Sequence, residues 1–312
     1  MRRSFPLTVS LVALALVSGC TAVPLAESWQ GPQVAGHIAA PAINECSGLA
    51  VSRRDPDLLW THNDSGGQPV LYAVDATGRL RGSVRLAGVR NYDWEDVASF
   101  KLDGQAWLIV AETGDNYAQR TDCELYVIAE PDPAELSPDH EITVPVTRRI
   151  SVRYPDGPRD CESIAVDIRE RLVYLISKRT SPPVVYTLPL DSVAGTTPEA
   201  TPIGALAGIP LPTGPEALIN APWGRYRPWP VGLDLAPDGT RAVVLTYGAA
   251  YLYARHAGET WAQAFARTPQ QLPAHGLPQA EAVCFSRDAR SIYISTEGNA
   301  SPLLRYIHRT QP

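Results

Sequence analysis

The sequence predicts an all-β fold, a β-propeller of five blades, and three observations support this prediction. The 312 residues are 45% hydrophobic and 19% charged, a composition typical of a globular domain with a sizeable core. The chain contains 23 glycines and 29 prolines, which favours many short turns over long helices. A short motif also recurs five times, at steps of 48, 67, 69 and 50 residues.

The N-terminus has the pattern of an export signal. Arg2 and Arg3 precede the apolar run Leu7–Val17, which is too short to cross the ~30 Å hydrocarbon core of a membrane. The run ends in Val17-Ser-Gly-Cys20, which resembles the lipobox of bacterial lipoproteins. This resemblance implies a signal peptide over 1–19 and a diacylated (for example palmitoylated) Cys20 that anchors the chain to a membrane. An ordinary cleavage site with an incidental cysteine is the alternative.

The residues around the anchor suggest where the mature protein lies. By the known sorting rule, Thr21 after the cysteine implies the outer membrane, on the periplasmic or surface side. Arg2-Arg3-Ser4-Phe5 partly matches a twin-arginine signal, so the export route stays open. Residues 20–36 are small and polar and are expected to form a lipidated tether, followed by a single propeller domain over 37–312.

The net charge excludes some partners. Without residues 1–19 the chain keeps 25 basic and 33 acidic residues, a net charge of −8. Nucleic acid and anionic lipid surfaces attract positive proteins, so neither is an expected non-specific partner.

Each repeat predicts three strands. The first strands are expected at Glu45–Ala50, Asp93–Ala98, Asp160–Ala165, Trp229–Asp234 and Gln279–Cys284. The second strands are expected at Leu58–His62, Leu108–Glu112, Val173–Ser177, Ala242–Thr246 and Ile292–Thr296. The third strands are expected at Val70–Val74, Glu124–Ile128, Val184–Leu188, Ala250–Tyr253 and Leu303–Ile307. These runs are β-branched or aromatic and are bounded by turn formers, as strands are.

The end of the chain predicts how the ring closes. The last repeat stops after its third strand, whereas Gln33–Ile38 remains unassigned near the start. We therefore expect this N-terminal segment to supply the outer strand of the last blade. Two alternatives stay open: a sixth, degenerate blade within the two long steps, or a β-sandwich with accidental internal similarity.

The repeat predicts a mouth rich in carboxylates. In a propeller, the first strand of each blade lines the channel, and the second strand runs antiparallel beside it. The start of each first strand and the end of each second strand therefore lie at the same mouth. Residues two apart on a strand point the same way. The expected metal ligands at this mouth are Glu45, Asp93, Glu95, Glu112, Asp115, Asn116, Asp160, Glu162 and Glu281.

Calcium is the cofactor that such a mouth suits. Crowded carboxylates repel one another, and Ca²⁺ accepts 6–8 oxygen ligands at ~2.3–2.6 Å. The loop Glu112-Thr-Gly-Asp-Asn116 is the best single metal-loop candidate. The alternative is that these acids cap turns, lie in water or pair with arginines such as Arg90, Arg120, Arg159 and Arg179.

A cationic spot is expected beside these acids. Lys178 is one of only two lysines in the chain, and Arg179 follows it at the rim. The expected ligand-binding residues are Asn63, Asp64, Lys178, Arg179, Tyr247 and Glu297. The cations can hold a phosphate or carboxylate of a ligand; a salt bridge to Asp160 or Glu162 is the alternative.

Several of these motifs together resemble a family. The loop Trp60–Gly66, the strand Asp93–Ala98, the loop Glu112–Asn116 and the unit from Glu281 to Asn299 look like secreted bacterial β-propeller proteins. These are distantly similar to the β-propeller phytases and their esterase-like relatives. The resemblance implies several calcium ions in an acidic mouth and makes Glu95, Glu162 and Lys178 candidate catalytic residues. The chain departs from it at Trp229 and Val231, where other repeats place acids.

Three functions are therefore kept. The first is a lipid-anchored envelope propeller whose mouth binds calcium and a small polar ligand or a loop of a partner protein. The second is a calcium-dependent, phytase-like phosphoester hydrolase, in which the metal polarises the phosphoryl group and activates a water. The third is an architectural protein of an envelope complex.

Four cysteines remain after Cys20. An exported domain folds in an oxidising compartment, so an even number of cysteines predicts disulfides. Cys123 and Cys161 are expected at the same mouth of adjacent blades and are paired on that ground. Cys46 and Cys284 are then expected to join the first and last blades.

Overall fold

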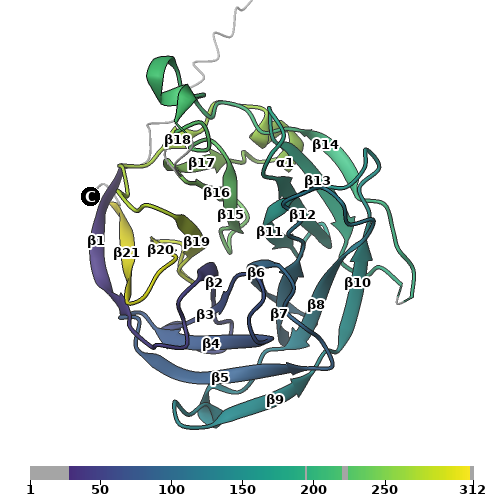
Figure 1. Cartoon of the computed structure of the whole chain (residues 1–312), viewed down its shortest axis with the longest axis vertical. Coiled ribbons are helices and arrows are strands. Elements are labelled where there is room, and N and C mark those ends of the chain that lie inside the picture. Colours follow the sequence, from purple (N-terminus) through teal and green to yellow (C-terminus); the bar gives the residue numbers. More distant parts are fainter. Residues whose placement is uncertain (1–27, 194, 220–223, 310–312) are drawn as a thin grey trace, which may run out of the picture.

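The computed structural model describes residues 28–193, 195–219 and 224–309. The predicted signal peptide, Cys20 and the first part of the predicted tether lie outside these residues. Among the described residues, no helix has the length and hydropathy needed to cross a membrane. The described strands form five sheets around a central axis, which confirms the five-bladed propeller and excludes a sixth blade or a sandwich in these ranges (Figure 1).

Each blade has an inner strand, a second strand, a third strand and an outer strand. Blade 1 comprises β2 (Cys46–Val51), β3 (Leu58–Asn63), β4 (Val70–Asp75) and β5 (Leu80–Ala87). Blade 2 comprises β6 (Trp94–Leu102), β7 (Gln105–Glu112), β8 (Cys123–Ala129) and β10 (Arg148–Val152). Blade 3 comprises β11 (Cys161–Asp167), β12 (Leu172–Ser177), β13 (Val184–Pro189) and β14 (Thr201–Ala205).

Blades 4 and 5 complete the ring. Blade 4 comprises β15 (Pro230–Leu235), β16 (Arg241–Thr246), β17 (Ala250–Ala254) and β18 (Gln270–Gln271). Blade 5 comprises β19 (Ala280–Phe285), β20 (Ser291–Thr296), β21 (Ser301–Arg309) and β1 (Ser28–Ile38). All predicted strands are therefore present, with ends that shift by a few residues.

The N-terminal strand closes the ring, as predicted. β1 pairs antiparallel with β21, so that Ser28 lies opposite Arg309 and Ile38 opposite Ser301. The strand begins at Ser28, so residues 28–36, which were expected in the tether, belong to the propeller. The first and last described strands of the chain thus share one blade (Figure 1).

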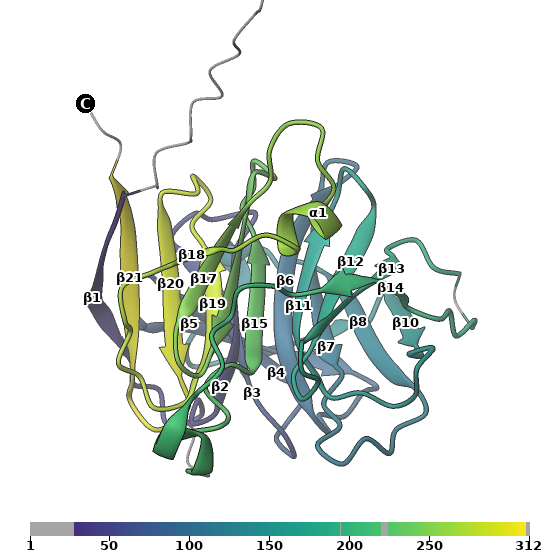
Figure 2. The ribbon, with the colours of Figure 1, turned by 90° about the horizontal axis from the view of Figure 1, so that it is seen from above.

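The two long steps between repeats hold additions to existing blades. The first contains the 3-10 turn η1 (Pro133–Glu135) and β9 (Glu141–Pro145), which pairs parallel with β5 and gives blade 1 a fifth strand. The second contains the 3-10 turn η2 (Gly214–Leu218). Helix α1 (Trp261–Phe265) lies between β17 and β18, and Figure 2 shows α1 and η2 at opposite ends of the inner strands.

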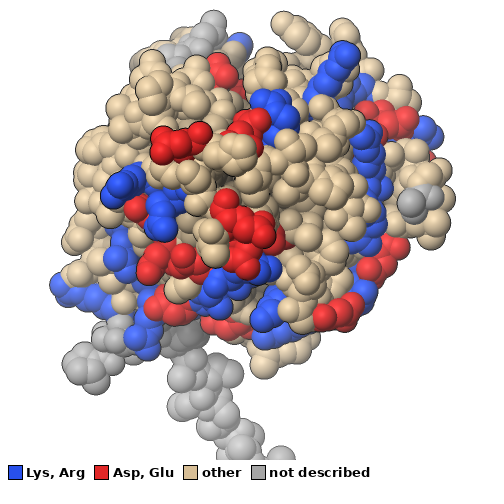
Figure 3. Space-filling model, turned by 90° about the horizontal axis from the view of Figure 1, so that it is seen from below, with Lys and Arg blue, Asp and Glu red and all other residues tan. Residues whose placement is uncertain are grey.

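The core consists of five apolar clusters, and each lies between two neighbouring blades. One example joins Trp60 and Leu71 of blade 1 to Trp94 and Leu108 of blade 2. A single sheet can bury its apolar faces only by packing against neighbouring sheets, so the blades depend on one another for stability. The face seen from below in Figure 1 carries acidic and basic residues side by side (Figure 3). Arg85 of β5 pairs with Glu141 of β9 at 2.6 Å.

The four described cysteines are free thiols, so the predicted Cys123–Cys161 and Cys46–Cys284 disulfides are wrong. The members of each expected pair do lie in one apolar cluster. Their thiols instead contact oxygen atoms, such as Thr61 Oγ1 at 3.1 Å from Cys46 Sγ and the Ile176 carbonyl at 3.1 Å from Cys161 Sγ. Burial raises the pKa of Cys46 to about 11 and that of Cys123 to about 12, which keeps both protonated.

Candidate functional site

The inner strands begin at one mouth of the ring, and each inner strand is irregular at its start. The pairing of every inner strand with its second strand shifts register near the third position of the repeat. A bulge there turns a side chain away from the regular alternation of the strand. The third positions are Ser47, Glu95, Glu162, Val231 and Glu281.

The mouth brings seven of the predicted acids together in three overlapping groups. Within each group, one oxygen of each carboxylate lies within 4.8 Å of the others. The groups are Glu95 with Asp160 and Glu162, Asp64 with Asp93 and Glu95, and Asp64 with Glu281 and Glu297. Since Glu95 and Asp64 each belong to two groups, the acids form one continuous arc over blades 3, 2, 1 and 5.

Most of these carboxylates are buried. Glu95 is 3% exposed, Glu162 4% and Glu281 5%. Burial, followed by the charge of Glu162, raises the pKa of Glu95 well above its usual range. The arc therefore keeps protons that isolated carboxylates lose, or needs cations in their place.

Asp64 is one of the two acids that belong to two groups of the arc, and its environment disfavours an uncompensated negative charge. Its Oδ1 is buried and has no hydrogen-bond partner among the described residues. Burial, then the charges of Glu281 and Asp93, raise the pKa of Asp64 to about 7. Burial and the charge of Asp160 likewise raise the pKa of Asp93 to about 6.

A glycine makes room for the arc. Gly114 follows β7, and its amide donates to the Asp93 carbonyl at 3.2 Å. A Cβ at this position would lie 2.1 Å from Glu95 Oε1 and 2.4 Å from Asp93 Cγ. Only glycine lets this turn approach the two carboxylates so closely.

Two cations close the arc on the side of blades 3 and 4. Lys178 is 5% exposed and pairs with Glu162, while Arg179 Nε lies 2.5 Å from Asp160 Oδ2. Although burial acts to lower it, the neighbouring carboxylates, above all Glu162, hold the pKa of Lys178 well above its usual range. The salt-bridge alternative considered for Lys178 is therefore the arrangement that the structure contains.

Blade 4 supplies aromatic rings instead of acids. The Trp229 ring lies 4.6 Å from the Arg179 guanidinium carbon and 5.9 Å from Lys178 Nζ. Tyr247 lies 5.2 Å from Lys178 Nζ, and its hydroxyl donates to Glu281 at 2.7 Å. Trp229, where the chain departs from the acidic repeat, thus packs against both cations.

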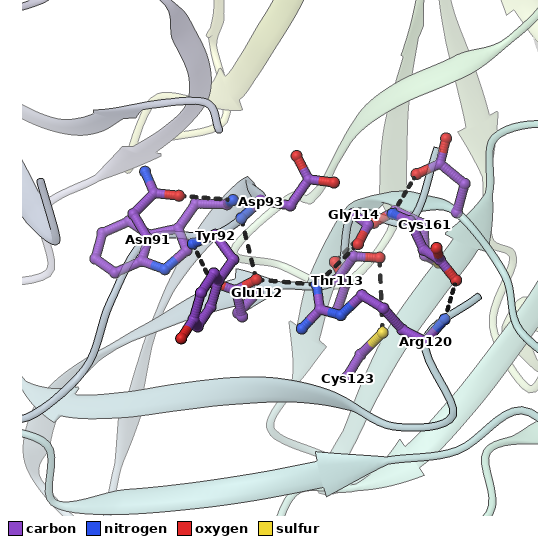
Figure 4. Close-up of polar contacts among 12 residues, drawn as sticks. Asn91, Tyr92, Asp93, Glu112, Thr113, Gly114, Arg120, Cys123 and Cys161 are labelled. Atoms are coloured by element: carbon purple, nitrogen blue, oxygen red, sulfur yellow. Dashed lines mark hydrogen bonds and ion pairs between the residues drawn. The ribbon is translucent and has the colours of Figure 1, made fainter. Parts of the chain in front are cut away.

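The loop Glu112–Asn116 supports the site through protein contacts. Glu112 accepts hydrogen bonds from the amides of Tyr92 and Asp93 (Figure 4). It also forms an ion pair with Arg120, which donates a second hydrogen bond to the Gly114 carbonyl. Asp115 caps the following turn by accepting from the amides of Gln119 and Arg120. Asn116 accepts from Arg179.

Two further predicted residues flank the arc. Asn63 accepts from the amides of Asn44 and Glu45 and donates to the Ala42 carbonyl, so it orders the loop before β2. Glu45 is half-buried, and its negative charge contributes to the raised pKa of Asp64, although burial contributes most. Neither residue belongs to the three carboxylate groups.

One central acid was not predicted. Asp96 occupies the fourth repeat position, where the other units have Gly48, Ser163, Gly232 and Ala282. Its carboxylate accepts from the amides of Val97, Ile164 and Leu233, at 2.8, 2.9 and 3.3 Å. Asp96 thereby links the inner strands of three blades below the arc. Its role could have been predicted from the sequence, because an acid stands here where the other repeats have small residues.

A cavity of about 380 Å³ adjoins the cationic side of the mouth. Its wall includes Trp229, Pro182, Pro183, Leu206 and Ile209, from the loops of blades 3 and 4. The mouth therefore combines oxygen ligands, two cations and an adjacent, largely apolar hollow. Such a combination suits a ligand with one charged and one apolar part.

The fold and the site define a five-bladed β-propeller with an acidic mouth that can hold a metal ion. No family model matches the chain, and no curated protein is significantly similar to it.

Proposed function

We propose that this protein is a lipid-anchored propeller of the cell envelope that binds calcium at its acidic mouth and, beside it, a small polar ligand. The observation that carries the proposal is the continuous arc of three carboxylate groups that share Asp64 and Glu95. Seven carboxylates face two cations there, so a divalent cation would relieve a surplus of negative charge.

The ligand atoms favour calcium over other metals. The three groups consist of carboxylate oxygens, which are hard ligands, whereas zinc favours nitrogen and sulfur. Calcium tolerates irregular sets of 6–8 oxygens, and a channel mouth with acids from several blades offers such a set. Magnesium needs nearly octahedral geometry and retains waters, which suits buried and crowded carboxylates less well.

The anchor rests on the sequence. Cys20 lies outside the described residues, and the lipobox-like motif Val17-Ser-Gly-Cys20 supports lipidation there. We expect Cys20→Ala to move the protein from the membrane fraction to the soluble fraction, with loss of the diacyl mass from the N-terminal peptide. A soluble wild-type protein without added lipid mass would overturn this part of the proposal.

Calcium binding is tested by thermal unfolding of the purified protein after a chelator has removed its metal. We expect calcium to raise the melting temperature of the wild-type protein and to have little effect on Glu95→Gln, because Glu95 joins two groups. A ligand at 100 times its Kd stabilises by about 2.7 kcal/mol. The matched control is Glu199→Gln, an exposed acid far from the mouth, which should respond as the wild type does.

Two results of this experiment would refute calcium binding at the arc. One is a wild-type melting temperature that calcium leaves unchanged. The other is an equal response of the wild type and Glu95→Gln, which would place the calcium elsewhere.

A calcium-dependent phosphoester hydrolase is the second candidate, and Asp64 favours it. In the absence of metal, Asp64 has a pKa of about 7 and an unpartnered oxygen, so its carboxylate could act as a general base near neutral pH. Calcium bound by the neighbouring acids would polarise the phosphoryl group. Calcium-dependent release of phosphate from phytate or an aryl phosphate, lost in Asp64→Asn, would support hydrolysis. Calcium binding without phosphate release would contradict hydrolysis and support only the binding function.

A further inference from the structure

The opposite mouth of the channel contains a second cavity, of about 370 Å³. It lies where the inner strands end, and residues after β2, β11, β15 and β19 line it together with the end of β6. The same strands thus begin at the acidic mouth and end at this one, as Figure 1 and Figure 2 allow the reader to follow.

The repeat explains which residues reach this cavity. Counted from the start of each motif, the ninth residue is Arg53, Lys101, Ile168, Pro237 or Arg287. All five line the cavity, and Arg169 adds a fourth cationic residue from the tenth position of blade 3. All five blades therefore contribute to one lining, four of them with a cation.

The positive charges are poorly compensated. The only acid in the lining is Asp167, which already pairs with Arg255 at 3.1 Å and accepts from Trp261 Nε1 at 2.9 Å. Lys101, Arg169 and Arg287 make no ion pair with another described residue. All three side chains are exposed, so a ligand in the cavity can reach them.

Arg53 is held in place at the same cavity. Its Nε and Nη2 donate to the Ser99 carbonyl at 3.1 and 2.8 Å, so the guanidinium is fixed before any ligand arrives. Burial lowers the pKa of Arg53, the charges of Asp234 and Glu130 oppose this, and the positive charge of Arg287 adds to the lowering. Like charges that converge on one hollow cost stability, which an anion would recover.

We propose that this second mouth, lined by Arg53, Lys101, Arg169 and Arg287, binds a small polyanion through its phosphate or carboxylate groups. The volume of about 370 Å³ falls in the range of small-molecule sites and exceeds what a single inorganic anion fills. The cations come from separate blades, so a ligand with several anionic groups can contact more of them than one with a single charge. The site is independent of calcium binding at the acidic mouth.

Isothermal titration with tripolyphosphate and with citrate tests this site on the purified protein. Metal is removed beforehand with a chelating resin, so that no anion binds through an ion at the acidic mouth. We expect one or both anions to bind in about 0.15 M salt, which screens exposed charges over ~8 Å. A preference between the two shows whether phosphate or carboxylate groups are recognised.

A double variant places the binding at the cavity. Loss of two charge-assisted contacts in Arg169→Gln with Arg287→Gln should weaken binding by about tenfold or more. Arg81→Gln is the matched control, an exposed arginine of the outer strand β5, and should change binding by less than about twofold. Absence of binding to both anions, or equal weakening in the control, would overturn the proposal.

A measurement on the wild-type protein guards against misfolding of the double variant. The chain has two lysines, of which Lys178 is buried and Lys101 is exposed at the cavity. A bound polyanion should slow the reaction of Lys101 with an amine-reactive reagent by several-fold, as read by peptide mass spectrometry. An unchanged rate at a saturating anion concentration would place any binding elsewhere.

Discussion

At the scale of single residues, the acidic mouth depends on close approach as much as on charge. Gly114 brings a turn of blade 2 against Asp93 and Glu95 at distances that no Cβ tolerates. The carboxylates are consequently confined between this turn and their own strands. Confined oxygens make a better site for a cation than mobile ones, because less conformational entropy is lost on binding.

Substitution of Gly114 by alanine should therefore damage the site. We expect Gly114→Ala to lower the free energy of unfolding by ~1–3 kcal/mol, the usual cost of overpacking, and to reduce stabilisation by calcium. Gly67→Ala is the control, since a Cβ there would meet no atom closer than 3.6 Å. Denaturant unfolding with and without calcium measures both effects, and an undiminished calcium response in Gly114→Ala would contradict the assignment.

The raised pKa values of the arc predict how stability depends on pH. A carboxyl group whose pKa is higher in the folded protein than the ordinary ~3.9 stabilises the folded state at low pH. This contribution to the free energy of unfolding is lost as the pH rises through the pKa of the folded state. For Asp93 and Asp64 these folded values are about 6 and about 7. Burial lowers the pKa of His62 and of His275 to about 4, which has the opposite effect between about pH 4 and 6.5.

The test therefore compares pH 6.5 with pH 8.5, as approximate values above the range in which the histidines titrate. Without metal, the free energy of unfolding should fall over this interval, with a slope of at most about 1.4 kcal/mol per pH unit for each proton released. Calcium should stabilise more at the higher pH, because it replaces those protons. The metal-free profile of Asp64→Asn should fall less steeply than that of the wild type over this interval, and a wild-type profile that does not fall would show that the acids are already ionised without metal.

At the scale of strands, the repeat pattern predicted most of the architecture. Fifteen strands were expected, in five groups of three, and each is present because alternation and turn residues were clear in runs such as Val173–Ser177. The parallel pairing of β9 with β5 was not predicted, since a strand that joins a neighbouring blade leaves no local signal. The bulges that aim Glu95 and Glu162 into the mouth have no sequence signature either.

The disulfide prediction failed for a related reason. The even number of cysteines and the expected compartment said nothing about the direction of each side chain. Cys46 and Cys161 occupy the second repeat position, as Trp94 does, and this position faces the apolar packing between blades. Proximity within a cluster does not provide the geometry of an S–S bond.

The closing strand β1 packs closely against blade 1. A Cβ on Gly36 of β1 would lie 1.9 Å from the Thr77 carbonyl oxygen, because β1 packs against the turn after β4 and His37 N donates to that same carbonyl. Gly36→Ala should therefore lower the melting temperature by several degrees. Hydrogen exchange should rise in β1 and β21 more than in β7. Uniform protection in the variant would show that the closure tolerates the change.

At the scale of the whole molecule, the channel has two chemically different ends. Acids gather where the inner strands begin, and Arg53, Lys101, Arg169 and Arg287 gather where they end or just beyond. The repeat sets both rings, since the same offset in each unit reaches the same height along the axis. The acidic end was predicted from the sequence. The basic end was not, although three of its four cations, Arg53, Lys101 and Arg287, stand at one fixed offset in their repeats.

Asp96 links three blades between these ends, and its substitution tests the integrity of the ring. Asn at this position has one acceptor oxygen instead of two, so it leaves at least one of the amides of Val97, Ile164 and Leu233 with a poorer partner. We expect Asp96→Asn to destabilise the protein by ~1–3 kcal/mol. Asp139→Asn, at an exposed turn, serves as the control, and equal unfolding midpoints for the two variants would contradict this role.

The pairing of β1 with β21 also determines when the protein can fold. β1, the first described strand, finds its partner only when β21, the last described strand, has been synthesised, so the ring stays open until then. Until then β20 has an unpaired edge, which is a template for pairing with other chains. Completion of the fold is consequently a late and concerted event, and a chain that stalls before Ser301 is left prone to aggregate.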